Sequence, residues 1–301
     1  MREPRVTILL ATYNGQRYLA EQLDSIVQQT HKNWDIITSD DGSSDQTLQI
    51  LKYYNIPIVN GPRQGYAANF LSLLTKVNSE SDYYAFADQD DVWMDHKLKQ
   101  ALAWLQSLPE EVPALYCGRT QLVDEYLQVI GYSPLFKKKP GFLNALTQNI
   151  GGGNTMVFNR TALNLLRQTK SHTDIVSHDW WAYLLISGAG GAVYYDAEPT
   201  VCYRQHAANI VGSNTNWLAR CSRVRMLLQR RFKRWMDLNS KSLFAVEHLL
   251  TPENKRVLEQ FEQVRRAWFF SRLIQLKLLG IYRQTTLGQM GLLIGALLNK
   301  I

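Results

Sequence analysis

The chain has 301 residues, of which 46% are hydrophobic and 20% charged, a balance that excludes a mostly disordered protein. The net charge of +7 is unevenly distributed: residues 217–301 hold 16 Lys and Arg against 5 Asp and Glu, whereas the first 216 residues hold 17 against 21. This split argues against a protein coated uniformly for nucleic acid, so no nucleic-acid partner is expected. It predicts instead an anionic partner for the basic tail.

Strands and helices alternate in the first half of the chain. Strands are expected at residues 6–11, 34–39, 56–59 and 83–87, and helices at residues 16–29, from 44 onward, 66–77 and 96–108. This alternation predicts βαβ units, and hence an α/β fold with a mostly parallel sheet flanked by helices.

The pattern changes after about residue 112. Shorter strands are expected at residues 115–117, 128–130, 155–158, 193–195 and 200–204, with helices at 161–168 and 178–187. From Trp217 onward the periodicity indicates helices only, with breaks near Thr251 and Gly280. We therefore expect a body over residues 1–216 and a basic helical extension over residues 217–301.

Cysteine usage and apolar runs indicate the compartment. Cys117, Cys202 and Cys221 are widely spaced, which argues against a zinc site or a disulfide framework and fits a reducing environment. The first apolar run, residues 6–11, is too short for the core of a signal peptide, and no stretch reaches the about 18 apolar residues of a membrane span. A cytoplasmic protein is expected.

A cluster of carboxylates follows the predicted strand at residues 83–87. It comprises Asp88, Asp90 and Asp91, interrupted by Gln89. Neighbouring carboxylates repel one another unless a cation lies among them, and oxygen ligands suit Mg²⁺ or Mn²⁺. The cluster therefore favours a metal–phosphate site over a solvated turn that caps the next helix.

Two other predicted strands end in polar residues. The first strand is followed by Thr12, Tyr13 and Asn14, and the second by Asp40 and Asp41. Such residues are commonly turn and cap residues, but a tyrosine can stack on a nucleobase and a carboxylate can accept a hydrogen bond from it. The carboxyl ends of parallel strands lie at one edge of a sheet, so the three clusters are expected to converge on one crevice.

In order along the chain, these clusters resemble those of the inverting glycosyltransferases of family 2, which have the Rossmann-like GT-A fold with a mixed, mostly parallel sheet. The resemblance extends over roughly residues 5–212 and includes the runs at residues 28–30, 178–181 and 203–209. The last two runs, with residues 86–93, resemble a rhamnosyltransferase branch that acts on bacterial surface polysaccharides.

The resemblance implies roles for individual residues. Those implied to bind the nucleotide sugar are Thr12, Tyr13, Asn14, Asp40, Asp41, Arg63, Asn69, Asp88 and Gln89. Asp90 and His206 would hold the metal, Mg²⁺ or Mn²⁺, although a lone histidine is more often a satisfied polar residue. Asp179 would be the general base that deprotonates the acceptor hydroxyl, with a helix N-cap as its alternative role.

The acceptor side is implied by weaker features. Gly152, Gly153 and Asn154 form either a close approach to the acceptor sugar or only a turn. Trp180 and Trp181 can stack on sugar rings, although tryptophans on helices usually belong to the core, and we expect one to face each way. The family's processive polymerases carry a Gln-x-x-Arg-Trp motif that this chain lacks, which favours transfer of a single sugar.

The basic tail begins with Arg220, Arg223 and Arg225 interleaved with apolar residues up to Trp235. This pattern is typical of a helix that lies on an anionic membrane, here peripherally at the inner face of the plasma membrane. Packing on the body and formation of a homo-oligomer through the apolar stretches at residues 273–279 and 287–298 stay open.

The resemblance to the rhamnosyltransferase branch implies transfer of L-rhamnose from dTDP-L-rhamnose onto a lipid-linked glycan of a surface polysaccharide such as O-antigen or capsule. A UDP-hexose or UDP-N-acetylhexosamine donor is the alternative within the same fold. A non-catalytic scaffold that binds a nucleotide sugar or a membrane is the alternative of another class.

Overall fold

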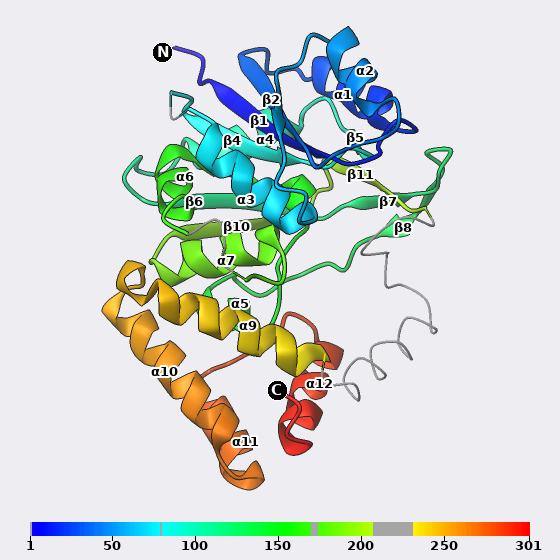
Figure 1. Ribbon diagram of the computed structural model, residues 1–301. Coiled ribbons are helices and arrows are strands. Elements are labelled where there is room, and N and C mark those ends of the chain that lie inside the picture. The colour runs from blue at the N-terminus through cyan, green and yellow to red at the C-terminus, as the bar shows by residue number, and fades with distance from the viewer. Residues whose placement is uncertain (1, 79, 170–173, 207–230) are drawn as a thin grey trace.

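The computed structural model describes residues 2–78, 80–169, 174–206 and 231–301. Its body is built on a seven-stranded sheet with the order β10-β6-β9-β4-β1-β2-β3 (Figure 1). The strands of this sheet are β1 (Val6–Thr12), β2 (Trp34–Asp40), β3 (Ile58–Asn60), β4 (Tyr83–Ala87), β6 (Ala114–Gly118), β9 (Val157–Asn159) and β10 (Ala192–Asp196). Only β9 runs antiparallel to its neighbours in this sheet, so the expected mixed, mostly parallel α/β fold is confirmed.

A second sheet has four strands in the order β5-β11-β7-β8. Its strands are β5 (Val92–Trp93), β7 (Gln121–Val123), β8 (Val129–Tyr132) and β11 (Val201–Arg204). The strands β5 and β7 were not expected from the sequence, because runs of two and three residues carry too little periodicity to be recognised.

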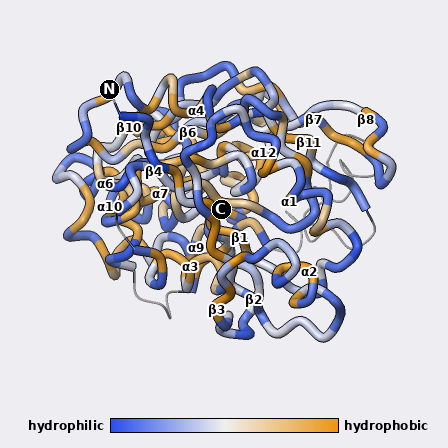
Figure 2. The backbone as a smooth tube through the Cα atoms, turned by 90° about the horizontal axis from the view of Figure 1, so that it is seen from above, coloured by the Kyte–Doolittle hydropathy of each residue, from blue (hydrophilic) through white to orange (hydrophobic). Residues whose placement is uncertain are grey.

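Helices cover both faces of the larger sheet. They are α1 (Leu19–Val27), α2 (Thr47–Tyr53), α3 (Tyr66–Lys76), α4 (Lys97–Leu105), α5 (Phe142–Ala145), α6 (Arg160–Leu166) and α7 (His178–Gly188), with the 3₁₀ turn η1 (Gly153–Thr155). Successive side chains of a strand point to opposite faces. Leu9 of β1 accordingly joins the core beneath α3 and α7, whereas Ile8 and Leu10 join the core beneath α1 and α4. Figure 2 shows hydrophobic colour along β1 and hydrophilic colour on the peripheral loops.

The C-terminal part is helical, as expected. It comprises α9 (Arg231–Ala245), the 3₁₀ turn η2 (Glu247–Leu249), α10 (Pro252–Arg266), α11 (Phe269–Leu278) and α12 (Thr286–Leu297). The predicted breaks are present: Thr251 caps α10, and Gly280 ends the α11 turn with a φ of 77°. The predicted boundary at Trp217 lies outside the described residues.

These helices pack on the body. Met236, Leu243 and Phe261 are buried in the same hydrophobic core as α7, and Figure 1 shows α9 running along that side of the body. Asn254 of α10 donates hydrogen bonds to the last carbonyl groups of α7. Within the described ranges, no helix has the length and apolar character needed to cross a bilayer.

Candidate active site

The three polar clusters lie together because their strands are neighbours. In the order β4-β1-β2, Thr12 at the end of β1 is in register with Asp40 at the end of β2. Leu10 of β1 is in register with Ala87, the last residue of β4 and the residue before Asp88. The carboxyl ends of parallel strands thus bring the predicted nucleotide and metal residues to one edge of the sheet.

Asp40 organises the turn that follows β2. Its buried carboxylate accepts hydrogen bonds from the hydroxyl groups of Thr12 (2.9 Å) and Ser43 (2.6 Å). It also accepts them from the backbone amides of Gly42 (3.1 Å) and Ser43 (2.8 Å). A carboxylate has about four acceptor sites, so a base N–H must take the place of one of these bonds to reach Asp40. Base recognition by Asp40 stays a prediction.

The Tyr13 side chain is 58% exposed. Its backbone is held by hydrogen bonds from the turn that follows β4. The side-chain amide of Gln89 accepts from the Tyr13 N–H (2.8 Å) and donates to the Tyr13 carbonyl (3.0 Å). A Cβ at Gly15 would lie 2.6 Å from Cδ of Gln89, which explains the glycine. Asn14 adopts a positive φ of 48° and accepts a hydrogen bond from Ser44 N–H at 2.9 Å. Gln89 therefore holds the loop that presents the exposed aromatic ring.

Asp41, Arg63 and Asn69 form the outer wall of this edge. The Asp41 carboxylate accepts from the backbone amides of Arg63 (2.6 Å) and Gly65 (2.9 Å), and so anchors the loop before α3. Asn69 is buried and donates to the carbonyl of Ser39 at 2.9 Å. This bond indicates that Asn69 stabilises the end of β2, and its expected contact with the nucleotide sugar stays a prediction.

The carboxylates after β4 have different surroundings. Asp90 is partly exposed, and its Oδ2 lies 2.9 Å from Nε2 of His206. Asp91 is fully buried, and it accepts hydrogen bonds from the Asn154 amide (2.5 Å) and the Arg204 N–H (3.3 Å). Asn154, expected on the acceptor side, thus donates to the carboxylate cluster, and its contact with the acceptor stays a prediction. The contact between His206 and Asp90 fits both a satisfied polar residue and a pair of metal ligands, so the role of His206 as a metal ligand stays a prediction.

Arg204 is a positioning residue that sequence reasoning missed. Its buried guanidinium donates to the carbonyl groups of Asp90 (3.0 Å) and Glu125 (2.8 Å) and to the carboxylate of Glu21 (2.6 Å). It also lies 4.4 Å from the ring centroid of Tyr18. Five guanidinium N–H groups in a rigid plane suit such a junction. The only signal in the sequence was its position two residues before His206.

The carboxyl groups of this cluster lie so close together that each disfavours the charged form of the others. Burial, followed by the charges of Asp90 and Asp179, raises the pKa of Asp88 to about 8. Burial and the charges of Asp90 and Asp88 raise the pKa of Asp91 well above its usual value. Carboxylates held this close favour a bound cation. The oxygen and imidazole donors of Asp88, Asp90 and His206 fit Mg²⁺ or Mn²⁺. No preformed set of three or more metal ligands occurs among the described residues.

Asp179 lies in the first turn of α7, within electrostatic reach of Asp88. Ser177 occupies the N-cap position but makes no side-chain cap bond, so Asp179 is not the N-cap residue, although its carboxylate lies in the first turn of the helix. Its Oδ1 accepts hydrogen bonds from the Ser177 hydroxyl and the Trp180 N–H. Asp179 thus lies near the carboxylate cluster but on a separate helix, and this placement suits the general base that the resemblance implies.

His178 precedes Asp179 and is buried among aromatic rings. It stacks on Phe70 with ring centroids 3.8 Å apart and meets Phe86 edge-on at 4.9 Å. Burial lowers the pKa of its imidazole to about 4, so the ring is neutral near pH 7. Neither ring nitrogen finds a hydrogen-bond partner among the residues that the structure describes. Gly153 of η1 packs directly against this ring, which explains a glycine there: a Cβ would lie 2.9 Å from Cε1.

Trp180 and Trp181 are both buried, so the expectation that one faces outwards is wrong. The indole N–H of Trp180 donates to the carbonyl of Ala145 (2.7 Å), and that of Trp181 to the Thr169 hydroxyl (2.9 Å). Helix α7 has core on nearly every side, which leaves no solvent-facing position for either ring. Gly152 lies beside Asn154, where a Cβ would come within 2.6 Å of Asn154 Oδ1.

The basic helix predicted from Arg220 is described only from Arg231 onward, in α9. Arg220, Arg223 and Arg225 lie outside the described residues. The described part packs on the body, which is one of the arrangements that the sequence left open.

Comparison with known proteins decides the family. Residues 7–166, more than half of the chain, match the model of glycosyl transferase family 2. The chain belongs to glycosyltransferase family 2. The resemblance seen in the motifs is thereby confirmed, and the protein is a glycosyltransferase.

Two curated relatives are similar in sequence to this glycosyltransferase. It is 30% identical to a dTDP-rhamnosyl transferase of Shigella flexneri over 75% of this chain and 81% of that protein. It is 28% identical to a UDP-Glc:α-D-GlcNAc-diphosphoundecaprenol β-1,3-glucosyltransferase of Escherichia coli, over 53% of this chain and 62% of the relative.

The structures share its fold. One is S. aureus TarS 1–349 with UDP, at a TM-score of 0.57 and 18% identity, over 98% of this chain and 80% of the other. The other is a Pyrobaculum calidifontis mannosyltransferase with GDP-Man and Mn²⁺, at a TM-score of 0.51 and 19% identity, over 100% and 88%. The GT-A fold expected from the motifs is confirmed by this likeness.

Proposed function

We propose that this glycosyltransferase moves a single L-rhamnose from dTDP-L-rhamnose onto a lipid-linked glycan during assembly of a bacterial surface polysaccharide. The observation that carries the donor is the 30% identity to a dTDP-rhamnosyl transferase, which extends over three quarters of this chain. A UDP-sugar is the second candidate donor, because a relative is a UDP-Glc-dependent glucosyltransferase and TarS binds UDP.

The chain's own residues have complementary parts in this transfer. The exposed ring of Tyr13 stacks on the base, and the turn formed by Thr12 and Asp40 supports the ribose side. Asp90 and His206, with Asp88 beside them, would hold Mg²⁺ or Mn²⁺, which when bound would supply positive charge to the departing diphosphate. Asp179 accepts the proton of the acceptor hydroxyl as that oxygen attacks the anomeric carbon.

Inversion of configuration is proposed because a retaining reaction needs a further carboxylate as nucleophile. Asp196, one of the remaining acidic residues of the body, is engaged in hydrogen bonds with other side chains. Its Oδ2 accepts hydrogen bonds from the Tyr116 hydroxyl (2.7 Å) and the Gln100 amide (2.8 Å). Asp196 is therefore not placed as such a nucleophile, and we assign to Asp179 the role of base in a direct displacement.

A lipid-linked acceptor is proposed from the E. coli relative, whose acceptor is a diphosphoundecaprenol-linked sugar. The surface of α11 and α12 suits a membrane that carries such a lipid. Phe270, Ile274 and Leu278 form an exposed apolar stripe on α11, and Leu287, Met290 and Ile294 form another on α12. Residues 267–301 hold four basic residues and no acidic one. Apolar stripes with positive charge favour peripheral docking on the anionic inner face of the plasma membrane.

The donor proposal is tested with purified protein, Mn²⁺ and a panel of dTDP- and UDP-sugars, by following release of the nucleoside diphosphate. We expect turnover with dTDP-L-rhamnose above all other donors. Turnover confined to a UDP-sugar would identify that sugar as the donor in place of dTDP-L-rhamnose. Nucleotide binding without turnover of any donor would support a non-catalytic scaffold instead.

The membrane proposal is tested by sedimentation with vesicles that contain phosphatidylglycerol. The triple variant Phe270→Ser, Ile274→Ser, Leu278→Ser should stay in the supernatant, whereas wild type and a Tyr53→Ser control, exposed on α2, should sediment. Equal sedimentation of all three proteins would contradict docking through this face. Concentration-dependent association of the wild type without vesicles, lost in the triple variant, would identify the face as an oligomer interface.

A further inference from the structure

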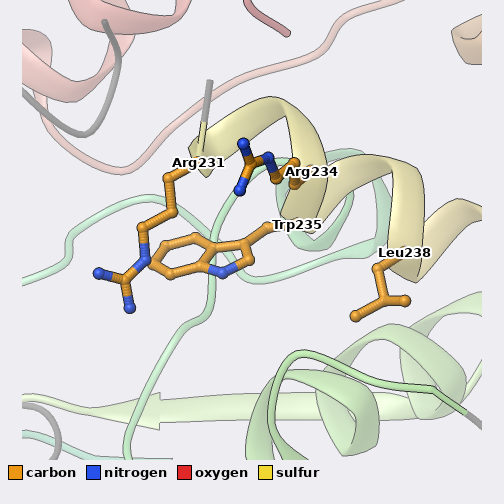
Figure 3. A pocket seen from close by; sticks show the side chains of 4 residues that line it. All are labelled: Arg231, Arg234, Trp235 and Leu238. Atoms are coloured by element: carbon orange, nitrogen blue, oxygen red, sulfur yellow. The ribbon is translucent and has the colours of Figure 1, made fainter. Parts of the chain in front are cut away.

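A pocket of about 640 Å³ lies beside the first turns of α9, at some distance along the chain from every predicted site residue. Of the described residues, it is lined by Arg231, Arg234, Trp235 and Leu238. Their spacing of three, four and seven residues places all four on one face of the helix. Figure 3 shows both arginine side chains and the Trp235 indole leaving the start of α9 around this space.

The pocket carries positive charge that its described surroundings do not neutralise. Both arginines are exposed, and neither makes an ion pair within the described part of the chain. The Arg231 guanidinium lies 4.9 Å from the centroid of the Trp235 ring, which orients it without neutralising it. Two guanidinium groups without carboxylate partners are suited to bidentate hydrogen bonds with phosphate oxygens.

The pocket adjoins the candidate general base. Trp235 packs edge-on against Trp180, with ring centroids 6.2 Å apart, and Trp180 directly follows Asp179. The charges of Asp179, Asp88 and Arg231 all act on Tyr66 at the start of α3. The pocket therefore lies on the same side of the body as Asp179, with the buried Trp180 ring between them.

The same helix start also contacts the proposed membrane-facing helices. Lys233 donates to the carbonyl of Ile301, just beyond α12, at 3.0 Å. Arg283, in the loop before α12, lies 4.9 Å from the ring centroid of Phe232. The start of α9 is thus joined to the segments that flank α12, through residues on other sides of the helix than the four that line the pocket.

The donor diphosphate does not account for this second anion site, because the donor's phosphates belong with the metal ligands after β4. We propose that the α9 pocket binds the diphosphate of the lipid-linked acceptor, with Arg231 and Arg234 as phosphate ligands and the Trp235 indole as an apolar wall. This inference rests on the proposed function for the lipid nature of the acceptor. It assigns the acceptor class as a diphosphate rather than a neutral glycolipid.

The test measures calorimetric binding of geranyl diphosphate, geranyl monophosphate and geraniol to the full chain. Saturating dTDP and Mg²⁺ occupy the donor site, so that the diphosphate cannot bind there. We expect geranyl diphosphate to bind most tightly and geraniol not at all. Arg231→Gln and Arg234→Gln should each weaken diphosphate binding about tenfold, since hydrogen bonds to charged groups contribute this much or more. The control Arg256→Gln, an exposed arginine on α10, should bind within twofold of wild type.

Three results would overturn the proposal. One is unchanged geranyl diphosphate binding in the Arg231→Gln, Arg234→Gln double variant. Another is equal binding of geranyl diphosphate and geraniol. The third is an equal loss, in the same variants, of affinity for phosphatidylglycerol vesicles without a diphosphate ligand, because the arginines would then bind the bilayer surface. Failure of the proposed function is measured separately, as absence of donor turnover by the wild type, and does not affect these binding measurements.

Discussion

Gly153 is the position where one methyl group should affect both stability and catalysis. In Gly153→Ala the new Cβ would lie 2.9 Å from Cε1 and 3.2 Å from Cδ2 of His178, and closer still to Nε2. The imidazole cannot retreat freely, because it is stacked on Phe70 at 3.8 Å and bounded by Phe86. Either η1 or the start of α7 must therefore move.

The size of the effect follows from this overlap. Ordinary van der Waals contact at a Cβ begins near 3.4 Å, so the ring and the loop must separate by roughly 1 Å. Overpacking of this kind costs about 1–3 kcal/mol of unfolding free energy. Asp179 is the next residue after His178, and a displacement of about 1 Å in a catalytic group can lower kcat about 100-fold.

A double-mutant cycle distinguishes this contact from a general loss of packing. Unfolding free energies would be measured by denaturant titration for Gly153→Ala, His178→Ala and the double variant. Removal of the imidazole makes room for the new methyl group, so we expect the double variant to be more stable than the sum of the single effects by about 1 kcal/mol or more. Strictly additive free energies, or an unchanged kcat in Gly153→Ala, would refute the reasoning.

Three further predictions concern other parts of the chain. Gly291→Ala in α12, where a Cβ meets nothing within 4 Å, should raise the unfolding free energy by about 1 kcal/mol in thermal or denaturant unfolding. Burial lowers the pKa of His178 from 6.5 to about 4, so its neutral form stabilises the fold above pH 6.5 and this contribution, about 3 kcal/mol, is lost as the pH falls toward 4. His178→Leu should therefore flatten the dependence of stability on pH in this window, and an unchanged slope would contradict the burial argument. Gln89→Ala removes two hydrogen bonds to the Tyr13 backbone, so it should raise KM for the donor severalfold with a smaller effect on kcat; equal KM values would contradict the loop-holding role.

The sequence predicted the parts of the fold that have strong local signals. Such signals are the apolar runs of β1 and β4 and the caps and glycines of the C-terminal helices. The parallel direction of most strands followed from their alternation with helices. Convergence of the polar clusters on one edge followed in turn from that topology. The strands β5 and β7 were missed because they are held by pairing across the small sheet rather than by local pattern.

Long-range partners of site residues were beyond sequence reasoning. Nothing local indicates that Arg204 joins Asp90 and Glu21, residues that lie 114 and 183 positions away. The Gln89 amide likewise supports Tyr13 across 76 positions, although the sequence suggested only a ligand contact. We expected one of Trp180 and Trp181 to face solvent because a surface helix usually has a solvent-facing side, but α7 is buried on nearly every side.

The central claim is that this glycosyltransferase transfers a sugar by pairing a metal held at Asp90 with a base at Asp179. The most direct measurement is turnover of dTDP-L-rhamnose with Mn²⁺ by wild type, Asp90→Asn and Asp179→Asn, each also assayed for nucleotide binding. We expect Asp90→Asn to lose both metal-dependent nucleotide binding and turnover, and Asp179→Asn to keep nucleotide binding while transfer falls at least about 100-fold. Turnover at wild-type rates in either variant, or none by wild type with any nucleotide sugar, would contradict the account.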